Sequence, residues 1–254
     1  MAKGNFQPAL ADVLVHEGGY TADPRDPGNW TGGKRGVGLL KGTKKGISAA
    51  AFPHLEIKNL TDSQIADIYH GKYWVPIRGD DLPAGVDLSA MDYGVNSGVS
   101  RSAKDLQRVL GVDVDGRVGP VTLLAAKRAD TRVVIKGHCG RRMSFLRSLA
   151  IWNTFGKGWS RRVAGVEAKA LSWVSSKAQL EADAKAARDK AVAQGGGAAV
   201  GTGSGVGVDQ APDLSGLPVW AIVAVVAVVV APLIIRAIVN AQRASALAQA
   251  AKEA

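Results

Sequence analysis

The sequence contains one cysteine, Cys139, and four histidines among its 254 residues. A single cysteine cannot form an internal disulfide bond, so a disulfide-stapled fold is excluded. The histidines and the cysteine do not recur at the spacing of metal ligands, so we expect no bound metal and no cofactor. Glutamate is also scarce, because Glu17 and Glu56 are the only two before Glu167.

Two further kinds of pattern are rare. Strand-like alternation of apolar and polar residues is sparse, which predicts a mainly α-helical chain. Residues 1–19 lack a continuous apolar stretch, so we expect no cleavable secretory signal there.

The net charge of +10 favours an anionic partner such as a lipid surface or a cell-wall polymer. No nucleic-acid-binding motif accompanies this charge, so we expect no nucleic-acid partner.

The stretch 16–20 (His-Glu-Gly-Gly-Tyr) lies at the end of the first predicted helix. Apolar residues recur at helical spacing over residues 6–14, which places Glu17 on or beside the apolar stripe. Gly18 and Gly19 end the helix. Partial desolvation and the negative end of the helix dipole both favour the protonated carboxyl group that a general acid needs. The alternative is a solvated glutamate in a last helical turn.

Several later segments have clear local patterns. Residues 23–28 contain two Asp-Pro steps and form a turn-rich loop, and residues 34–45 form a basic loop or irregular hairpin. Thr61 or Asp62 begins a helix with Tyr69 on its apolar side. The glycines between Phe155 and Arg162 predict a loop before a last helix.

The C-terminal third differs in composition. Residues 176–194 are alanine-rich with mixed charges, which predicts at best a solvated helical stalk. Seven glycines among residues 195–208 predict a flexible linker. Residues 217–235 carry no charge, and as a helix they would span roughly 28 Å of a bilayer core of ~30 Å. Trp220 and Arg236 lie at its edges, where interface anchors are expected.

These features predict a single-pass protein of the inner (cell) membrane, inserted in the lipid bilayer through residues 217–239. Charges beyond the span place the C-terminus in the cytoplasm and the N-terminal part in the periplasm or outside the cell. The lack of a signal peptide argues against easy export, so the direction is left open.

Five motifs occur in order along the first hundred residues: Glu17–Tyr20, Asp23–Gly28, Thr43–Ser48, Tyr73-Trp74 and Asp92–Gly98. With these motifs the sequence resembles the glycoside hydrolase family 108 N-acetylmuramidases, known from phage endolysins and secretion-associated muramidases. A second part, which includes Asp115-Gly116 and Gly119-Pro120, is similar to the peptidoglycan-binding module of that family.

The resemblance implies a mainly α fold with a lysozyme-like helical domain, a small helical peptidoglycan-binding half and, outside the shared part, a single transmembrane helix. The expected boundaries are 5–98 for the catalytic domain, 99–175 for the peptidoglycan-binding domain, 176–216 for the charged stalk and Gly-rich linker, 217–239 for the transmembrane helix and 240–254 for a short basic tail.

The resemblance also implies roles for individual residues. Glu17 is expected to be the catalytic acid that cleaves the β-1,4 bond between N-acetylmuramic acid and N-acetylglucosamine. Glycoside hydrolysis needs a second group on the face of the sugar ring opposite the acid. Asp26 is favoured for this role over Asp23 and Asp92. Thr43 is expected to orient water, with a plain turn residue as the alternative. The expected substrate-binding residues are Tyr20, Trp74, Asp92 and Asn96.

Alternative roles remain for several of these residues. The aspartates beside proline can serve as turn caps, Asp92 and Asn96 can hold a helix end, and the aromatic residues can pack in the core. At the level of function, the alternatives are a non-catalytic, membrane-anchored peptidoglycan-binding protein and a lytic transglycosylase. The expected partner is peptidoglycan. A role in lysis would add a holin as a partner, and a role in secretion would add a secretion system.

Overall fold

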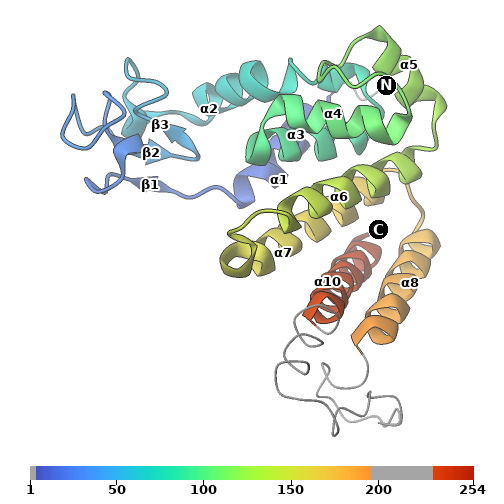
Figure 1. Ribbon diagram of the computed structural model, residues 1–254. Helices are drawn as coiled ribbons and strands as arrows, with labels where there is room; N and C mark the ends of the chain where they lie inside the picture. Colours follow the sequence, from blue (N-terminus) through green and yellow to red (C-terminus); the bar gives the residue numbers. More distant parts are fainter. Residues whose placement is uncertain (1–3, 196–230) are drawn as a thin grey trace, which may run out of the picture. The chain divides into compact units, whose positions relative to one another are not determined.

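The computed structural model describes residues 4–195 and 231–254, and the chain forms two compact units, Met1–Arg142 and Met143–Ala254. The first unit carries a short three-stranded sheet and most of the helices (Figure 1). Its strands and main helices are β1 (Tyr20–Thr21), β2 (Thr43–Lys44), β3 (Ile47–Ser48), α1 (Phe6–Val15), α2 (Asp62–Tyr69), α3 (Val86–Ser97), α4 (Val99–Leu110), α5 (Pro120–Arg128) and the greater part of α6 (Thr131–Arg147). The expectation of a mainly helical chain is confirmed.

The core of the first unit is built around α3. Every residue of this helix from Val86 to Gly94 is buried, and α3 packs against both α1 and α4. A helix that is buried on all sides has no need of a polar face, which agrees with the small and apolar residues over most of its length. The helix α2 begins at Asp62 after its N-cap Thr61, one of the two expected starting residues, and the side chains of Thr61 and Gln64 form a capping box.

Several polar side chains are nevertheless buried where α3, α4 and α6 meet. The Tyr93 hydroxyl donates to Asp105 at 2.7 Å, and the His138 ring lies between the Ser89 hydroxyl and the Ser102 carbonyl oxygen, each at 3.1 Å. A buried polar group without a partner is costly, so such groups are stable here only as a connected set. We call this set the buried polar network: Ser89, Asp92, Tyr93, Ser102, Asp105, His138 and Arg142.

Burial shifts the acid–base behaviour of this region. It lowers the pKa of His138 to about 4, because the charged ring would lose its hydration. Burial also raises the pKa of Asp87, at the start of α3, to about 6, although hydrogen bonds from Asn5 and from main-chain N–H groups oppose that shift. For Asp105, burial acts to raise the pKa, but hydrogen bonds from Tyr93 and two arginines outweigh it and lower the pKa.

The sheet lies at one end of the first unit. Strand β2 is central, and it pairs antiparallel with β1 and with β3. The 21-residue connection 22–42 joins β1 to β2 and includes a 3-10 turn at Pro27–Asn29, whereas β2 and β3 are joined by a tight turn at Lys45 and Gly46. We call residues 16–48 the β lobe.

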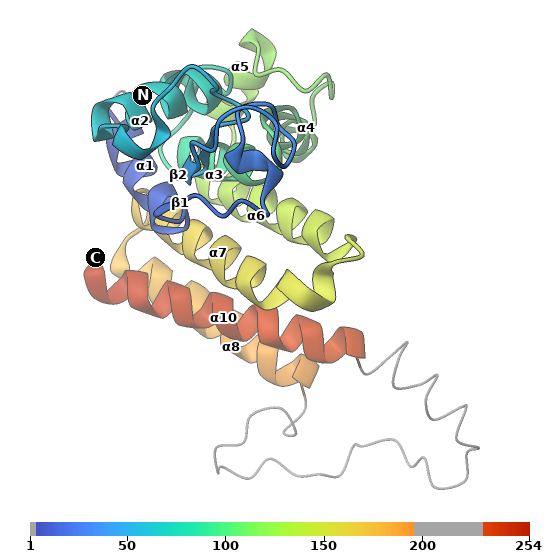
Figure 2. The same ribbon diagram turned by 90° about the vertical axis from the view of Figure 1, so that its left-hand side faces the viewer.

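In the part of the second unit that the structure describes there are three long helices, α7 (Trp152–Ser172), α8 (Lys177–Gly195) and α10 (Ala231–Glu253). Helix α10 packs along α8 and α7, and Figures 1 and 2 show it beside α8 from two directions. Arg243 of α10 donates to Glu167 of α7 at 2.9 Å. The helix α8 occupies the expected stalk, but its Leu180, Ala184 and Ala187 are buried, so one face of it packs rather than being solvated.

The predicted membrane localisation is wrong. Over the described residues, no helix combines the length and the apolar character needed to cross a bilayer. Of the predicted span, residues 217–230 lie outside the described residues, and residues 231–239 belong to α10. That helix continues with Arg236 and Arg243, and the residues that it buries are mainly alanines.

The predicted loop between Phe155 and Arg162 is also wrong, because these residues form the first half of α7. Its aromatic side chains recur at helical spacing and contact one another: the Phe155 and Trp159 ring centroids are 5.6 Å apart, and those of Trp152 and Trp159 are 6.3 Å apart. The Trp152 ring covers Gly156, where a side chain would collide with it. This glycine therefore serves close packing inside a helix and does not mark a loop.

Candidate active site

Glu17 lies in the turn between α1 and the sheet. The helix ends at Val15, and the Glu17 N–H still donates to the Leu14 carbonyl oxygen at 3.3 Å. The next residue, Gly18, accepts a hydrogen bond of 3.1 Å from the Lys45 N–H, which joins this turn to the β2–β3 turn. The Glu17 side chain is half-buried. The carboxyl group is therefore held between a helix end and the sheet.

Lys45 approaches the same helix end with its charge. Its Nζ atom lies 3.4 Å from the Leu14 carbonyl oxygen and 3.5 Å from that of Glu17. A cation at the C-terminus of a helix offsets the partial negative charge of the helix dipole. The local sequence predicts the negative end of the helix dipole beside Glu17 with no counter-charge, because nothing in it shows that Lys45 folds back onto α1.

Three elements meet at Gly46. Its φ of +71° is a left-handed conformation that favours glycine. A Cβ atom at this position would lie 3.0 Å from Glu17 Oε2 and 3.1 Å from the Tyr69 hydroxyl oxygen. That hydroxyl donates to the Lys45 carbonyl oxygen at 2.8 Å. The absence of a side chain at Gly46 thus leaves room for the Glu17 carboxylate and the Tyr69 hydroxyl on the same side of the turn.

Tyr69 is a residue that the sequence did not mark as part of the site. Its spacing with Ile65 predicts an apolar position on α2, and the ring is indeed buried. The hydroxyl at the tip of that buried ring reaches the β2–β3 turn. Periodicity reports which face of a helix is buried, but it does not report what the end of a long side chain contacts.

Thr43 is held by a second residue that the sequence did not single out. The Thr43 hydroxyl donates to Asn29 Oδ1 at 2.7 Å, and Asn29 Nδ2 donates to the Asp23 carbonyl oxygen at 2.9 Å. The Asn29 carbonyl oxygen also accepts from the N–H groups of Lys41 and Gly42, each at 3.0 Å. Asn29 is fully buried and joins the two ends of the β1–β2 connection. The Thr43 oxygen can still accept a hydrogen bond from water.

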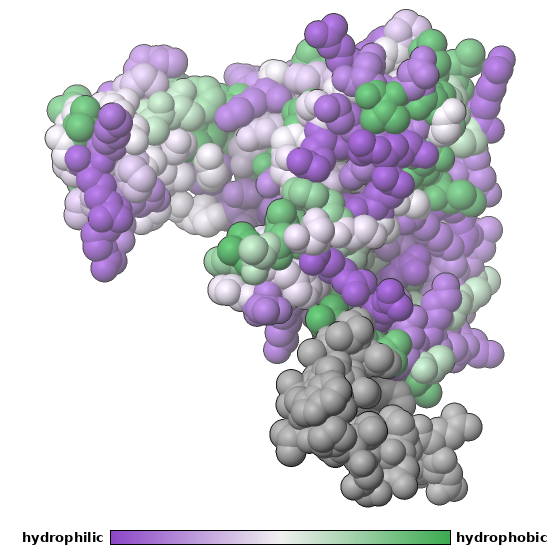
Figure 3. Space-filling model, in the orientation of Figure 1, coloured by the Kyte–Doolittle hydropathy of each residue, from purple (hydrophilic) through white to green (hydrophobic). Residues whose placement is uncertain are grey.

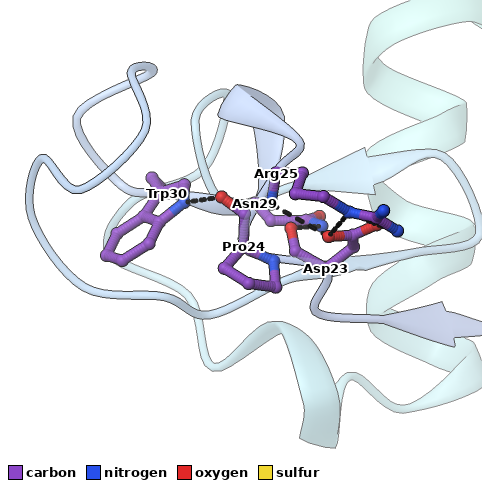
Figure 4. A network of polar contacts seen from close by, with 5 residues as sticks. All are labelled: Asp23, Pro24, Arg25, Asn29 and Trp30. Carbon is purple, nitrogen blue, oxygen red and sulfur yellow. Dashed lines mark hydrogen bonds and ion pairs between the residues drawn. The ribbon is translucent and has the colours of Figure 1, made fainter.

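Asp23 is occupied within its own loop. Arg25 holds both carboxylate oxygens, with an ion pair of 2.8 Å, and its N–H donates to Asp23 Oδ1 at 2.9 Å (Figure 4). Hydrogen bonds from the side chain and then the N–H of Arg25 lower the pKa of Asp23 to about 2. Trp30 closes the same loop by donating from Nε1 to the Pro24 carbonyl oxygen at 3.0 Å. Asp23 therefore shapes the loop.

Asp26 is exposed and begins the 3-10 turn that follows. Its Oδ1 accepts from the Gly28 N–H at 2.8 Å, which is the turn-capping contact that the sequence offered as an alternative. This cap uses one carboxylate oxygen of an exposed side chain, on the same connection that carries Asn29.

Two expected substrate-binding residues lie in the interior. Asp92 has no exposed surface and forms an ion pair of 2.5 Å with Arg142 of α6. Trp74 is 1% exposed and packs beside Phe6, with ring centroids 5.5 Å apart. Neither side chain offers a surface to a sugar, so we exclude both from the proposed site. Their sequence motifs are explained by core packing and by a helix-to-helix ion pair.

The other two expected substrate-binding residues are at the surface. Tyr20 begins β1 three residues after Glu17 and is 41% exposed. Asn96 is exposed near the end of α3 and accepts a hydrogen bond of 2.9 Å from the Ser97 hydroxyl. Over the described residues, no three His, Cys, Asp or Glu side chains gather to hold a metal ion.

Comparison with known proteins gives matches for two successive segments of the chain. Residues 10–98 match the family described as Glycosyl hydrolase 108, and residues 101–164 match a family described as Predicted Peptidoglycan domain. Among solved structures, a chain titled "Structure of Brucella abortus SagA" is 40% identical, with a TM-score of 0.56. The match covers 67% of this chain and 95% of that one. No curated protein sequence matches. The chain belongs to the glycosyl hydrolase 108 family and is a glycoside hydrolase that acts on peptidoglycan.

Proposed function

We propose that this protein is an N-acetylmuramidase in which Glu17 is the catalytic acid. The position of Glu17 carries the proposal, since its carboxylate is half-buried at the junction of α1, the β2–β3 turn and Tyr69. The region of the chain that matches the catalytic family contains one other glutamate, Glu56, which is exposed and paired with Lys41 at 2.7 Å. A general acid needs a partly desolvated carboxyl group, which favours Glu17 over Glu56.

In the proposed reaction Glu17 protonates the glycosidic oxygen as the bond to the anomeric carbon breaks. Positive charge then develops on the sugar ring, and a second group must act from the opposite face. Asp26 is the best supported of the three candidates, because Asp92 is buried in an ion pair and Asp23 is held by Arg25. Water then adds to the anomeric carbon and leaves a reducing end; its proton passes to Asp26 if the water attacks directly, or to the ionised Glu17 if Asp26 has first bonded to the sugar.

Thr43 is proposed to position that water as a hydrogen-bond acceptor. Its own proton is donated to Asn29, so the hydroxyl has a fixed orientation. Tyr20 and Asn96 are proposed to contact the sugar chain, since both are exposed and belong to the matched catalytic region.

The proposed biological role, which rests on the resemblance, is host lysis, with wall remodelling during secretion as the alternative. Deleting the gene distinguishes the two, because only the first role predicts that induced host cells no longer lyse.

The decisive experiment compares the full chain with Glu17→Gln and, as a matched control, Glu56→Gln on purified peptidoglycan. We expect Glu17→Gln to lower product release by roughly 10²–10⁴-fold, the usual contribution of a general acid, and Glu56→Gln to have little effect. Reduction of the products followed by mass spectrometry identifies the new ends. Reducing muramic acid supports hydrolysis, whereas a 1,6-anhydro end would show a lytic transglycosylase. Equal activity of both variants would contradict the proposal.

A further inference from the structure

The stretch that runs from the β1–β2 connection past β3 carries an unusual charge distribution. Residues 27–55 contain five lysines and arginines and no acidic residue. Three of these cations are held inside the unit. Lys41 forms an ion pair of 2.7 Å with Glu56, and the Nζ atoms of Lys44 and Lys45 contact main-chain carbonyl oxygens. Those three lysines therefore serve the fold.

The other two cations, Lys34 and Arg35, are exposed at the tip of this connection. Beside them, Val37, Leu39 and Leu40 are 48%, 65% and 38% exposed. Figure 3 shows hydrophobic and hydrophilic side chains next to each other at the end of the β lobe. We call residues 31–41 the basic hairpin. It presents positive charge and apolar surface together, which is typical of a binding surface rather than of a solvated loop.

Main-chain hydrogen bonds fix the shape of the basic hairpin. The Thr31 N–H donates to the Leu39 carbonyl oxygen at 2.9 Å, and the Gly32 N–H donates to that of Val37 at 3.1 Å. The Leu39 N–H in turn donates to the Thr31 hydroxyl at 2.9 Å. Gly38 adopts a φ of +79° where a side chain would collide with Thr31. The exposed apolar residues are thus displayed on an ordered turn.

The hairpin belongs to the same lobe as the proposed catalytic groups. It continues directly from the loop of Asp23 and Asp26, and the charge of Arg35 contributes, after the dominant hydrogen bonds from Arg25, to the lowered pKa of Asp23. Its base is fixed by Asn29, which also holds Thr43. A ligand bound at the hairpin would therefore contact the lobe that carries the proposed catalytic groups.

We propose that the basic hairpin binds the stem peptides of peptidoglycan, with Lys34 and Arg35 pairing with peptide carboxylates and the apolar residues contacting alanine methyl groups. This inference rests on the proposed function, since it assigns a peptide-recognition role beside the glycan-cleaving site. An anionic lipid surface is the weaker occupant. Electrostatic attachment to membranes typically uses clusters of about 4–8 Lys or Arg residues, and the tip offers two.

The test measures binding in the full chain carrying Glu17→Gln, so that the substrate stays intact. The ligands are soluble glycan strands that keep their stem peptides and the same strands after an amidase has removed them. The hairpin variant is Lys34→Gln/Arg35→Gln. The control, Lys185→Gln/Arg188→Gln, removes one lysine and one arginine from exposed positions on α8, outside both matched families.

We expect the hairpin variant to bind peptide-bearing strands about tenfold more weakly, with a difference that shrinks at high salt. Binding to the stripped strands and the unfolding temperature stay unchanged, and the control variant behaves like its parent. The inference is overturned if the hairpin variant binds both kinds of strand as well as its parent does, or if it loses the same binding on both kinds. Loss of binding to phosphatidylglycerol vesicles with an unchanged preference for peptide-bearing strands would also overturn it and would identify a lipid surface.

The same strands separate this inference from the proposed function. The enzyme without the Glu17 substitution is expected to cut both kinds of strand, because the bond that it breaks lies in the glycan. Failure to cut either strand would contradict the muramidase proposal, while the binding difference between the two strands would still decide the role of the hairpin.

Discussion

The buried polar network and the β lobe both contain charged and hydrogen-bonding side chains. The network buries and pairs these side chains, whereas the β lobe leaves several of them accessible. In the network, Asp92 and Arg142 are 0% and 2% exposed and paired with each other. In the β lobe, Glu17 is half-buried, and Asp26 and Arg35 are exposed. The first arrangement locks helices together, whereas the second leaves charged groups accessible to a ligand. Charge in this protein therefore serves stability where it is buried and paired, and is proposed to serve chemistry where it is accessible.

The largest predicted effect breaks the buried pair. Arg142→Met leaves the Asp92 carboxylate in the interior without its ionic partner, which is expected to cost ~3–5 kcal/mol of unfolding free energy. Urea denaturation measures this. The double variant Asp92→Leu/Arg142→Met removes both charges and is expected to recover most of the loss and to keep its activity. If the double variant is as unstable as the single one, the pair is not the source of the effect. If it is stable but inactive, Asp92 has a role in the site.

The pH dependence of stability is expected to contain two opposing contributions. The folded pKa of His138 is about 4 and its unfolded value is 6.5, so between these values the unfolded chain binds a proton that the folded chain does not. Stability therefore falls as the pH is lowered through this window, by up to ~3 kcal/mol. The variant His138→Gln is expected to lose this dependence when unfolding is followed from pH 7 to pH 4.

Asp87 acts in the other direction. Its folded pKa of about 6 lies above the unfolded value of 3.8, so the folded chain holds a proton that the unfolded chain releases. Its contribution is present at low pH and is lost as the pH rises from about 3.8 to about 6, again by up to ~3 kcal/mol. Asp87→Asn should therefore become relatively less stable than the parent toward pH 4. If the free energy of unfolding depends on pH in the same way in His138→Gln and Asp87→Asn, the opposing contributions assigned to His138 and Asp87 are excluded.

Within the β lobe, the expected effects on stability are smaller. Asn29→Ala removes the amide that links Thr43 to the Asp23 carbonyl oxygen and leaves these half-buried groups without that partner, at a cost of ~1–3 kcal/mol. Activity is expected to fall as well, because the β1–β2 connection loses its anchor. Asn59→Ala, at an exposed position, is the control. A stable but inactive Asn29 variant would indicate a direct chemical role for Asn29.

The smallest predicted change separates backbone strain from site geometry. Gly46→Ala and Gly111→Ala place a methyl group at φ values of +71° and +67°, so both variants carry a similar strain of ~1–2 kcal/mol. Only the methyl group at Gly46 meets the Glu17 carboxylate and the Tyr69 hydroxyl. We therefore expect kcat to fall about tenfold for Gly46→Ala and to stay near the parent value for Gly111→Ala. Equal kcat values for the two variants would contradict the proposed position of the site.

Local sequence patterns were sufficient for part of this architecture. The apolar spacing of residues 6–14 followed by Gly18 and Gly19 predicted the end of α1 to within three residues of Val15, and one of the two expected N-cap residues, Thr61, caps α2. Both depend on contacts within one or two helical turns, which are encoded by neighbouring residues. The same kind of pattern failed in α7, because the glycine at position 156 makes room for the Trp152 ring.

The sequence alone therefore determined the helical class, several helix ends, the resemblance to a peptidoglycan hydrolase and the choice of Glu17 as the candidate acid. Only the tertiary structure paired Asp92 with Arg142, fifty positions away in the sequence. It also brought Asn29, Lys45 and Tyr69 to the site. It also placed α10 against α7 and α8. The physical reason is that periodicity and capping act between near neighbours, whereas burial and ion pairing depend on which distant segments the fold brings into contact.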